Sequence, residues 1–129
     1  MDLSIKPSRF VAIMAVLSIL VVQVFPQTFS AIYLGWFVFL SYVVAIAFHE
    51  IGYVVAGWLA GFSLKRLIIF TIHIIKTEHG FKIKEFHNLM GFSGLTIMVP
   101  LKEGVSRIQL IIQSLGGPLF SLIVTLISI

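Results

Sequence analysis

The sequence predicts a mainly α-helical, polytopic membrane protein with about three transmembrane helices and a membrane-associated β-hairpin between the second and third. Composition is the first reason, because 59% of the 129 residues are apolar and 11% are charged, against roughly a quarter charged in a soluble domain. The mean hydropathy of +1.10 agrees. Because a chain this short has little interior, it cannot bury all of this apolar surface away from water. We therefore expect lipid to cover it.

The first apolar run, residues 10–25, predicts a membrane anchor. It follows Lys6 and Arg9 and stops at Pro26, which makes it slightly short for a spanning helix of about 20 residues. Basic residues before a short apolar core are also typical of a cleaved signal peptide. A second long apolar run follows at once, and this favours a hairpin of two membrane helices.

Two further apolar runs, residues 31–62 and 108–129, are long enough to cross a bilayer. In the earlier of them, Gly52, Ala56 and Ala60 recur every four residues. Such a ridge of small residues lets neighbouring membrane helices approach closely. We therefore expect another helix to lie against this ridge.

The last run contains Pro118. Proline removes one hydrogen bond from a helix and predicts a kink there. The same run carries small and polar residues spaced four apart, which we expect to face other helices instead of lipid. This stripe consists of Gln113, Gly117, Ser121 and Thr125.

The residues between the second and third runs predict a β-hairpin followed by a loop. Residues 67–75 are rich in β-branched side chains and predict one strand, and residues 81–86 predict its partner, with Gly80 in the turn. An isolated hairpin is barely stable in water, so its apolar face should lie against the membrane or the helices. Residues 88–100 are interrupted by glycines and a proline and predict a re-entrant or interfacial strand and loop.

Basic residues set the expected orientation and partners. Every Lys and Arg precedes the first run or lies between the second and third, so the positive-inside rule places the N-terminus and residues 63–107 in the cytoplasm and the C-terminus outside. We expect a single domain over residues 1–129, integral to the plasma (inner) membrane, with the lipid bilayer as its partner. Nucleic acid is not an expected partner, because the basic residues sit beside apolar spans.

One acidic side chain, Glu50, falls inside a predicted span, next to His49. An acid at the bilayer centre costs about 2.5–3.5 kcal/mol on insertion scales, so it indicates a functional site. Tyr53 follows His49 by four residues and shares its helical face, whereas Glu50 projects about 100° away. In the motif H-E-x-x-H two histidines bind zinc and the glutamate polarises the attacking water. Here the second histidine position holds Tyr53.

Residues 48–53, Phe-His-Glu-Ile-Gly-Tyr, resemble the active-site helix of the site-2 protease family of intramembrane zinc metallopeptidases. In that family a membrane-associated β-hairpin follows this helix and a Gly-Pro turn opens a later span. Residues 67–84 and Gly117-Pro118 are similar to both features, in the same order. The resemblance implies zinc as cofactor, held at His49 and Tyr53, and Glu50 as the catalytic general base. It also implies a membrane-embedded or membrane-associated peptide or protein as substrate.

Two departures from the family pattern bear on activity. Tyr53 stands at the second metal position, and a phenol with a pKa near 10 is a poor ligand. The family's third ligand is an aspartate in a later span, and no aspartate follows Asp2. Because a catalytic zinc normally has three protein ligands plus water, zinc binding is expected to be weak or absent in this chain as given.

These departures leave alternatives open. The chain is either a piece of a longer zinc protease that supplies the remaining ligands, or a catalytically inactive pseudoprotease. A pseudoprotease would bind a peptide or a partner membrane protein in an immunity, transport or regulatory role. In a third interpretation, His49 and Glu50 are a buried hydrogen-bonded pair that serves only helix association.

Overall fold

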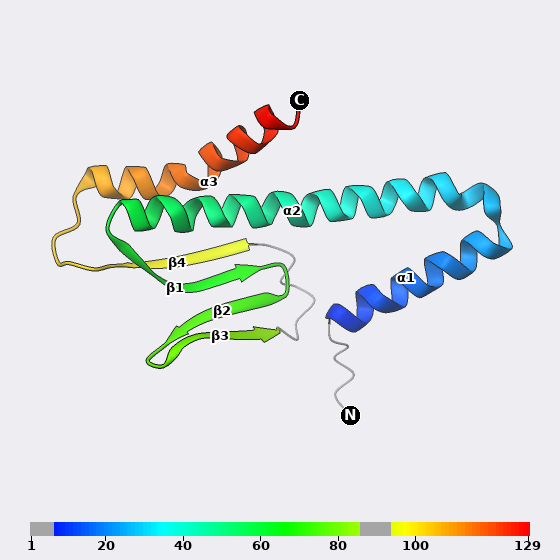
Figure 1. The fold of residues 1–129 in the computed structure, drawn as a ribbon, viewed down its shortest axis with the longest axis horizontal. Coiled ribbons are helices and arrows are strands. Elements are labelled where there is room, and N and C mark those ends of the chain that lie inside the picture. Colours follow the sequence, from blue (N-terminus) through cyan, green and yellow to red (C-terminus); the bar gives the residue numbers. More distant parts are fainter. Residues whose placement is uncertain (1–6, 86–93) are drawn as a thin grey trace.

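The computed structural model describes residues 7–85 and 94–129. This part of the chain is mostly helical, which confirms the mainly α prediction, and it also contains a four-stranded antiparallel sheet. Figure 1 shows α2 as a long rod, with α3 and the sheet on its C-terminal half and α1 beneath its N-terminal half. The elements are α1 (Pro7–Val24), η1 (Pro26–Thr28), α2 (Phe29–Leu59), β1 (Phe62–Ile69), β2 (Ile72–Thr77), β3 (Gly80–Glu85), β4 (Gly94–Pro100) and α3 (Arg107–Ile127).

Two helical stretches in the described residues, Pro26–Leu59 and Arg107–Ile127, are long and apolar enough to cross a membrane. Helix α1 is apolar but shorter. No residue in the most apolar part of the first stretch is buried within the molecule, and Phe37 and Leu40 are more than half exposed. Exposed apolar side chains that follow one another along a whole helix mark a site of contact with a membrane or another protein. Together with the length of these helices, it suggests membrane association.

Proline and glycine set the ends of the first two helices. Pro26 disfavours helical geometry in the residue before it, and Phe25 accordingly leaves the helix with φ −129°. Helix α2 ends at Leu59, three residues before the end of the predicted run 31–62. The reason is Gly61, whose φ of +85° is the left-handed conformation that commonly terminates helices.

The predicted hairpin is part of a larger sheet with strand order β3-β2-β1-β4. The single strand predicted for residues 67–75 is wrong, because a tight turn at Phe70, with φ 57°, divides this segment between β1 and β2. The next turn is where the sequence predicted it, and Thr77 pairs with Gly80 across it. The turn residues Phe70 and Thr71 are of types that favour strands as much as their neighbours do, so the composition contained no signal for a boundary.

Strand β4 occupies the segment for which only a broken strand was predicted. Residues 88–93 of that segment lie outside the described residues, as does Phe86 of the predicted second hairpin strand. Residues 94–100 form a regular strand that pairs antiparallel with β1, from Ile69↔Gly94 to Phe62↔Pro100. Most of the region expected as hairpin and loop, 63–107, is therefore sheet.

The small hydrophobic core lies between α2 and this sheet. Val54 of α2 packs with Leu64 and Leu67 of β1, and Met98 of β4 lies against the cluster. Gly57 makes the approach possible, because a Cβ added there would meet the Met98 side chain. The sheet is thus fixed to the C-terminal half of α2.

Helix α3 begins with a reciprocal capping box, in which the side chains of Ser106 and Gln109 each accept a hydrogen bond from the other's backbone N–H. This satisfies two N–H groups that a helix start otherwise leaves unpaired. The helix contains Pro118, and Figure 1 shows α3 changing direction about its middle, so that its last turns lean away from α2. This agrees with the kink predicted from the sequence.

Candidate functional site

Helices α2 and α3 touch at their backbones. A Cβ added to Gly52 would collide with the carbonyl oxygen of Gly116 and with Phe120, and a Cβ added to Gly116 would collide with Ala56. The ridge of small residues predicted on α2 therefore contacts α3, at Gly52 and Ala56. This contact brings residues 49–53 directly beside the middle of α3.

His49 is half-buried and contacts both α3 and Tyr53 of its own helix. Its Nδ1 lies 3.0 Å from Ser121 Oγ, and its ring meets the Tyr53 ring edge-on at a centroid distance of 5.0 Å. Gly117 leaves just enough room for both rings, since a Cβ added there would lie 2.8 Å from His49 Nε2. The polar stripe predicted on α3 thus faces His49 through Gly117 and Ser121.

Glu50 projects about 100° around α2 from His49, toward β4. The residue is 6% exposed, and Thr96 Oγ1 donates a hydrogen bond to its Oε2 at 2.5 Å. Gly94 packs directly on the carboxyl group, where any added Cβ would collide with it. Burial of a carboxyl group is costly unless it is hydrogen-bonded, so β4 is what makes this position tolerable. Gly94 and Thr96 share one face of β4, and no sequence pattern predicted them as site residues.

The three residues predicted from the sequence line one cavity of about 360 Å³ between α2, β4 and α3. The rest of its wall comes from Gly94 and Thr96 of β4 and from α3. Its α3 residues include Gln113, the first member of the predicted polar stripe. Another cavity shares His49, Glu50 and Gly94 and extends along α2. Spaces of this size accept small ligands or single side chains of a larger one.

This arrangement does not by itself fit a catalytic zinc ion. Across residues 7–85 and 94–129, no three or more His, Cys, Asp or Glu side chains are close enough to hold one metal. His49 and Glu50 face different elements, and each has a hydrogen-bond partner on the element it faces. Tyr53 contacts His49 through its ring. A catalytic zinc takes three protein ligands and leaves a fourth position open.

Comparison with protein-family models, with curated proteins and with solved structures finds no match for this chain. A function for this chain therefore has to follow from the geometry of α2, β4 and α3. That geometry places a buried acid beside a sheet edge, with a histidine and a tyrosine across the same cavity.

Proposed function

We propose that this chain is a site-2-protease-like membrane protein that binds an extended, membrane-associated peptide beside Glu50. The observation that carries the proposal is the position of β4. It is an edge strand among the described strands, and its inner face holds the Glu50 carboxyl group through Gly94 and Thr96. An edge strand offers unpaired backbone groups to which an extended peptide adds as a further strand.

In the proposed complex, the peptide backbone pairs with β4 and one of its side chains enters the cavity next to the strand. Leu95 of β4 lines that cavity and is 47% exposed. Backbone pairing gives affinity with little dependence on sequence, and a pocket for alternate side chains gives selectivity. The peptide is membrane-associated because the strand lies against a helix apolar enough to cross a bilayer.

The chain as it stands binds and does not cut in this proposal. Hydrolysis needs an activated water, and it is the metal that lowers the pKa of water from 15.7 to about 7. Glu50 without a metal does not supply that activation. The side chains available to bind a metal therefore support best the pseudoprotease alternative that the sequence predicted.

The second candidate is an intramembrane zinc peptidase in which a longer protein supplies the missing ligand. It is favoured by the cavity shared by His49, Glu50 and Tyr53. Glu50 would then act as general base. Metal analysis of detergent-purified wild type, Tyr53→His and His49→Ala distinguishes the candidates: stoichiometric zinc in the wild type that His49→Ala removes would favour the peptidase.

The proposal includes three membrane spans, α1, α2 and α3, with the N-terminus and the sheet on the cytoplasmic side of the plasma (inner) membrane. The support is the distribution of Lys and Arg. A cysteine at Glu78, in the exposed turn between β2 and β3, should resist an impermeant thiol reagent in intact cells and react after lysis. Labelling in intact cells would reverse the orientation.

The binding proposal is tested with a photo-crosslinking residue at Leu95 on β4, and with the same residue at Ile83 on the opposite edge strand β3 as control. The probe is a Val- and Thr-rich peptide in lipid vesicles, compared with a copy N-methylated at alternate amides, which cannot pair as a strand. We expect crosslinks from position 95 only, and loss of these crosslinks with the N-methylated copy. Equal crosslinking from both edges, or no effect of methylation, would overturn the proposal.

A further inference from the structure

The cavity beside β4 takes its charge from one acid. Glu50 lines it, and no Lys or Arg of the described residues contributes to its wall. The same holds for the adjoining cavity along α2, which shares Glu50. His49 lines both cavities, but its ring is directed toward α3, where Nδ1 lies 3.0 Å from Ser121 Oγ. The space that a bound peptide enters therefore presents a negative charge and no opposing Lys or Arg from the described chain.

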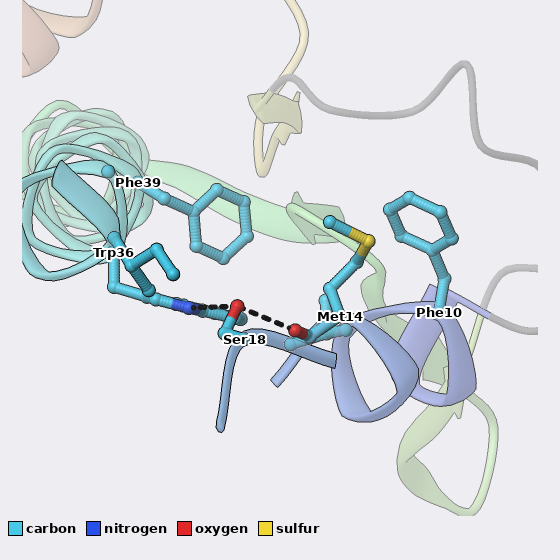
Figure 2. A pocket seen from close by; sticks show the side chains of 8 residues that line it. Phe10, Met14, Ser18, Trp36 and Phe39 are labelled. Atoms are coloured by element: carbon cyan, nitrogen blue, oxygen red, sulfur yellow. Dashed lines mark hydrogen bonds between the residues drawn. The ribbon is translucent and has the colours of Figure 1, made fainter. Parts of the chain in front are cut away.

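The cavity between α1 and α2, of about 290 Å³, is different in kind. No charged side chain of the described residues lines it, and Figure 2 shows the Phe10, Met14 and Phe39 side chains around the space. Its polar side chains are already paired, since Ser18 Oγ donates to the Met14 carbonyl at 2.7 Å and accepts from Trp36 Nε1 at 3.1 Å (Figure 2). Of these two spaces, the one beside β4 is therefore suited to select a charged ligand.

Glu50 has room for a further hydrogen-bond donor. Thr96 Oγ1 donates to its Oε2, and a carboxylate offers about four lone-pair sites to donors. The residue is 6% exposed, and a buried carboxylate is costly unless an opposite charge and hydrogen bonds compensate it. Gly94 packs directly on the carboxyl group, so a peptide paired with β4 passes close to it. A cationic side chain of that peptide would compensate the buried charge.

The other polar groups of the wall suit an ammonium group. Gln113 and Ser114 of α3 add an amide oxygen and a hydroxyl oxygen to the same cavity. A lysine ammonium donates three hydrogen bonds as a compact point charge, so it can use acceptors from several directions. Arginine binds a carboxylate best through both of its oxygens, and Thr96 already donates to one of them. The lining therefore favours lysine.

We propose that the cavity beside β4 binds a lysine side chain of the peptide, whose ammonium group pairs with Glu50. This inference rests on the proposed function, since the peptide reaches the cavity by pairing with β4. Lysine suits a membrane-associated peptide, because its apolar stem can lie along apolar surface while its charged end reaches a polar site. Successive side chains of a strand point to opposite faces, so the chain selects peptides with a lysine on the face turned toward the cavity.

The test compares three Val- and Thr-rich peptides that differ at one central position. The first has lysine there, the second norleucine, which is similar in length and uncharged, and the third arginine. Affinity is measured from the concentration dependence of crosslinking to photo-leucine at position 95, in phosphatidylcholine vesicles, after subtraction of binding to protein-free vesicles. We expect the lysine peptide to bind roughly ten- to hundred-fold more tightly than the norleucine peptide, because hydrogen bonds to charged groups are strong.

Two variants locate the selection. Glu50→Gln keeps the size of the side chain, removes the charge and should abolish the preference for lysine. Gln113→Lys places an ammonium group in the same cavity and should also abolish the preference, because the resident charge pairs with Glu50. Since Gln113→Lys keeps Glu50, it tests the pairing independently of any loss of folding in Glu50→Gln. Glu78→Gln, in the exposed turn between β2 and β3, is the matched control and should keep the full preference.

The outcomes separate this inference from the proposed function. Crosslinks at position 95 with equal affinity for the lysine and norleucine peptides would leave strand addition intact and overturn the selection of lysine. Absence of crosslinks with every peptide would overturn strand addition itself. A preference for lysine that persists in both Glu50→Gln and Gln113→Lys would assign the ammonium group to another acid. An arginine peptide that binds as tightly as the lysine peptide would overturn the choice of lysine.

Discussion

The C-terminal half of α2 meets α3 at backbone distance, whereas its N-terminal half meets α1 through long side chains that leave a groove. In the first region, here the packed half, Gly52 faces Gly116 so closely that neither tolerates a Cβ. In the second, the open half, Gly35 has no atom of the described chain within 4 Å of an added Cβ. Glycine thus permits a close helix contact in one half and borders open space in the other.

The difference explains why the His and Glu side chains of α2 lie in its C-terminal half. His49 and Glu50 lie in the packed half, where Ser121 of α3 and Thr96 of β4 supply hydrogen bonds. In lipid a polar group without such a partner is costly, and helices that approach through small residues bring partners within reach. In the open half, Trp36 Nε1 donates a hydrogen bond to Ser18 Oγ across the contact with α1, and the cavity beside this pair is otherwise lined by apolar residues.

The largest expected effect is on the α2–α3 contact. Gly116→Leu should force the helices apart and destabilise the protein by about 3 kcal/mol, because overpacking of a closed interface displaces backbone. Gly35→Leu, the matched change in the open half, should stay within about 1 kcal/mol of wild type. Thermal unfolding in detergent followed by circular dichroism measures both. Equal losses in the two variants would remove the distinction between the halves.

The next effect concerns the partner of Glu50. Thr96→Val keeps the shape of the side chain and removes the hydroxyl, so a buried carboxyl oxygen loses its donor at a cost of about 1–3 kcal/mol. Thr96→Ser should keep most of the wild-type stability, because the hydroxyl remains. Unfolding midpoints of the three proteins test this order. If Thr96→Ser is as unstable as Thr96→Val, the hydroxyl is not what holds Glu50.

A smaller effect is expected from the serines that pair across each helix contact. Ser121→Ala removes the partner of His49 Nδ1, and we expect a loss of about 1 kcal/mol. Ser18→Ala removes the partner of Trp36 in the open half, where both residues are less enclosed, and should cost less. Comparable losses from the two serines would indicate that the open half is as tightly packed as the other.

Much of this contrast could be predicted from the sequence, because it depends on local spacing. The four-residue repeat through Gly52 and Ala56 predicted a close helix contact, and Gly117 and Ser121 predicted the face that meets it. Helical geometry also predicts that His49 and Glu50 project in different directions from α2, and they contact α3 and β4 respectively. These features can be predicted from the helical period alone.

The features that could not be predicted depend on contacts between distant segments. Thr96 became a partner of Glu50 through the pairing of β4 with β1, which the broken pattern of residues 88–100 did not reveal. The turn at Phe70 was hidden because its residues resemble those of the strands around it. Gly35 lies alone in an apolar run, and nothing local shows whether such a glycine faces a neighbour or an open space.

The smallest expected effect is a pH dependence that arises in the sheet, which packs against the C-terminal half of α2. His73 of β2 is 8% exposed, and its burial, followed by the positive charge of Arg66, lowers the pKa of His73 below its usual value of 6.5. The folded state therefore binds a proton less readily than the unfolded state. Stability should be fully present above pH 6.5 and should fall as the pH decreases below that value.

Unfolding midpoints between about pH 8 and about pH 5, the range in which histidines titrate, test this dependence. His73→Gln should reduce the acid-induced loss, whereas His79→Gln, in an exposed turn, should leave it unchanged. With Trp58 replaced by phenylalanine, the emission of Trp36 in the folded protein should stay constant over this range, because His73 lies on the sheet whereas Trp36 lies at the contact between α1 and α2. A shift of Trp36 emission that follows the acid-induced loss of stability would show that the two halves of α2 unfold together. The two halves would then differ in packing but not in stability.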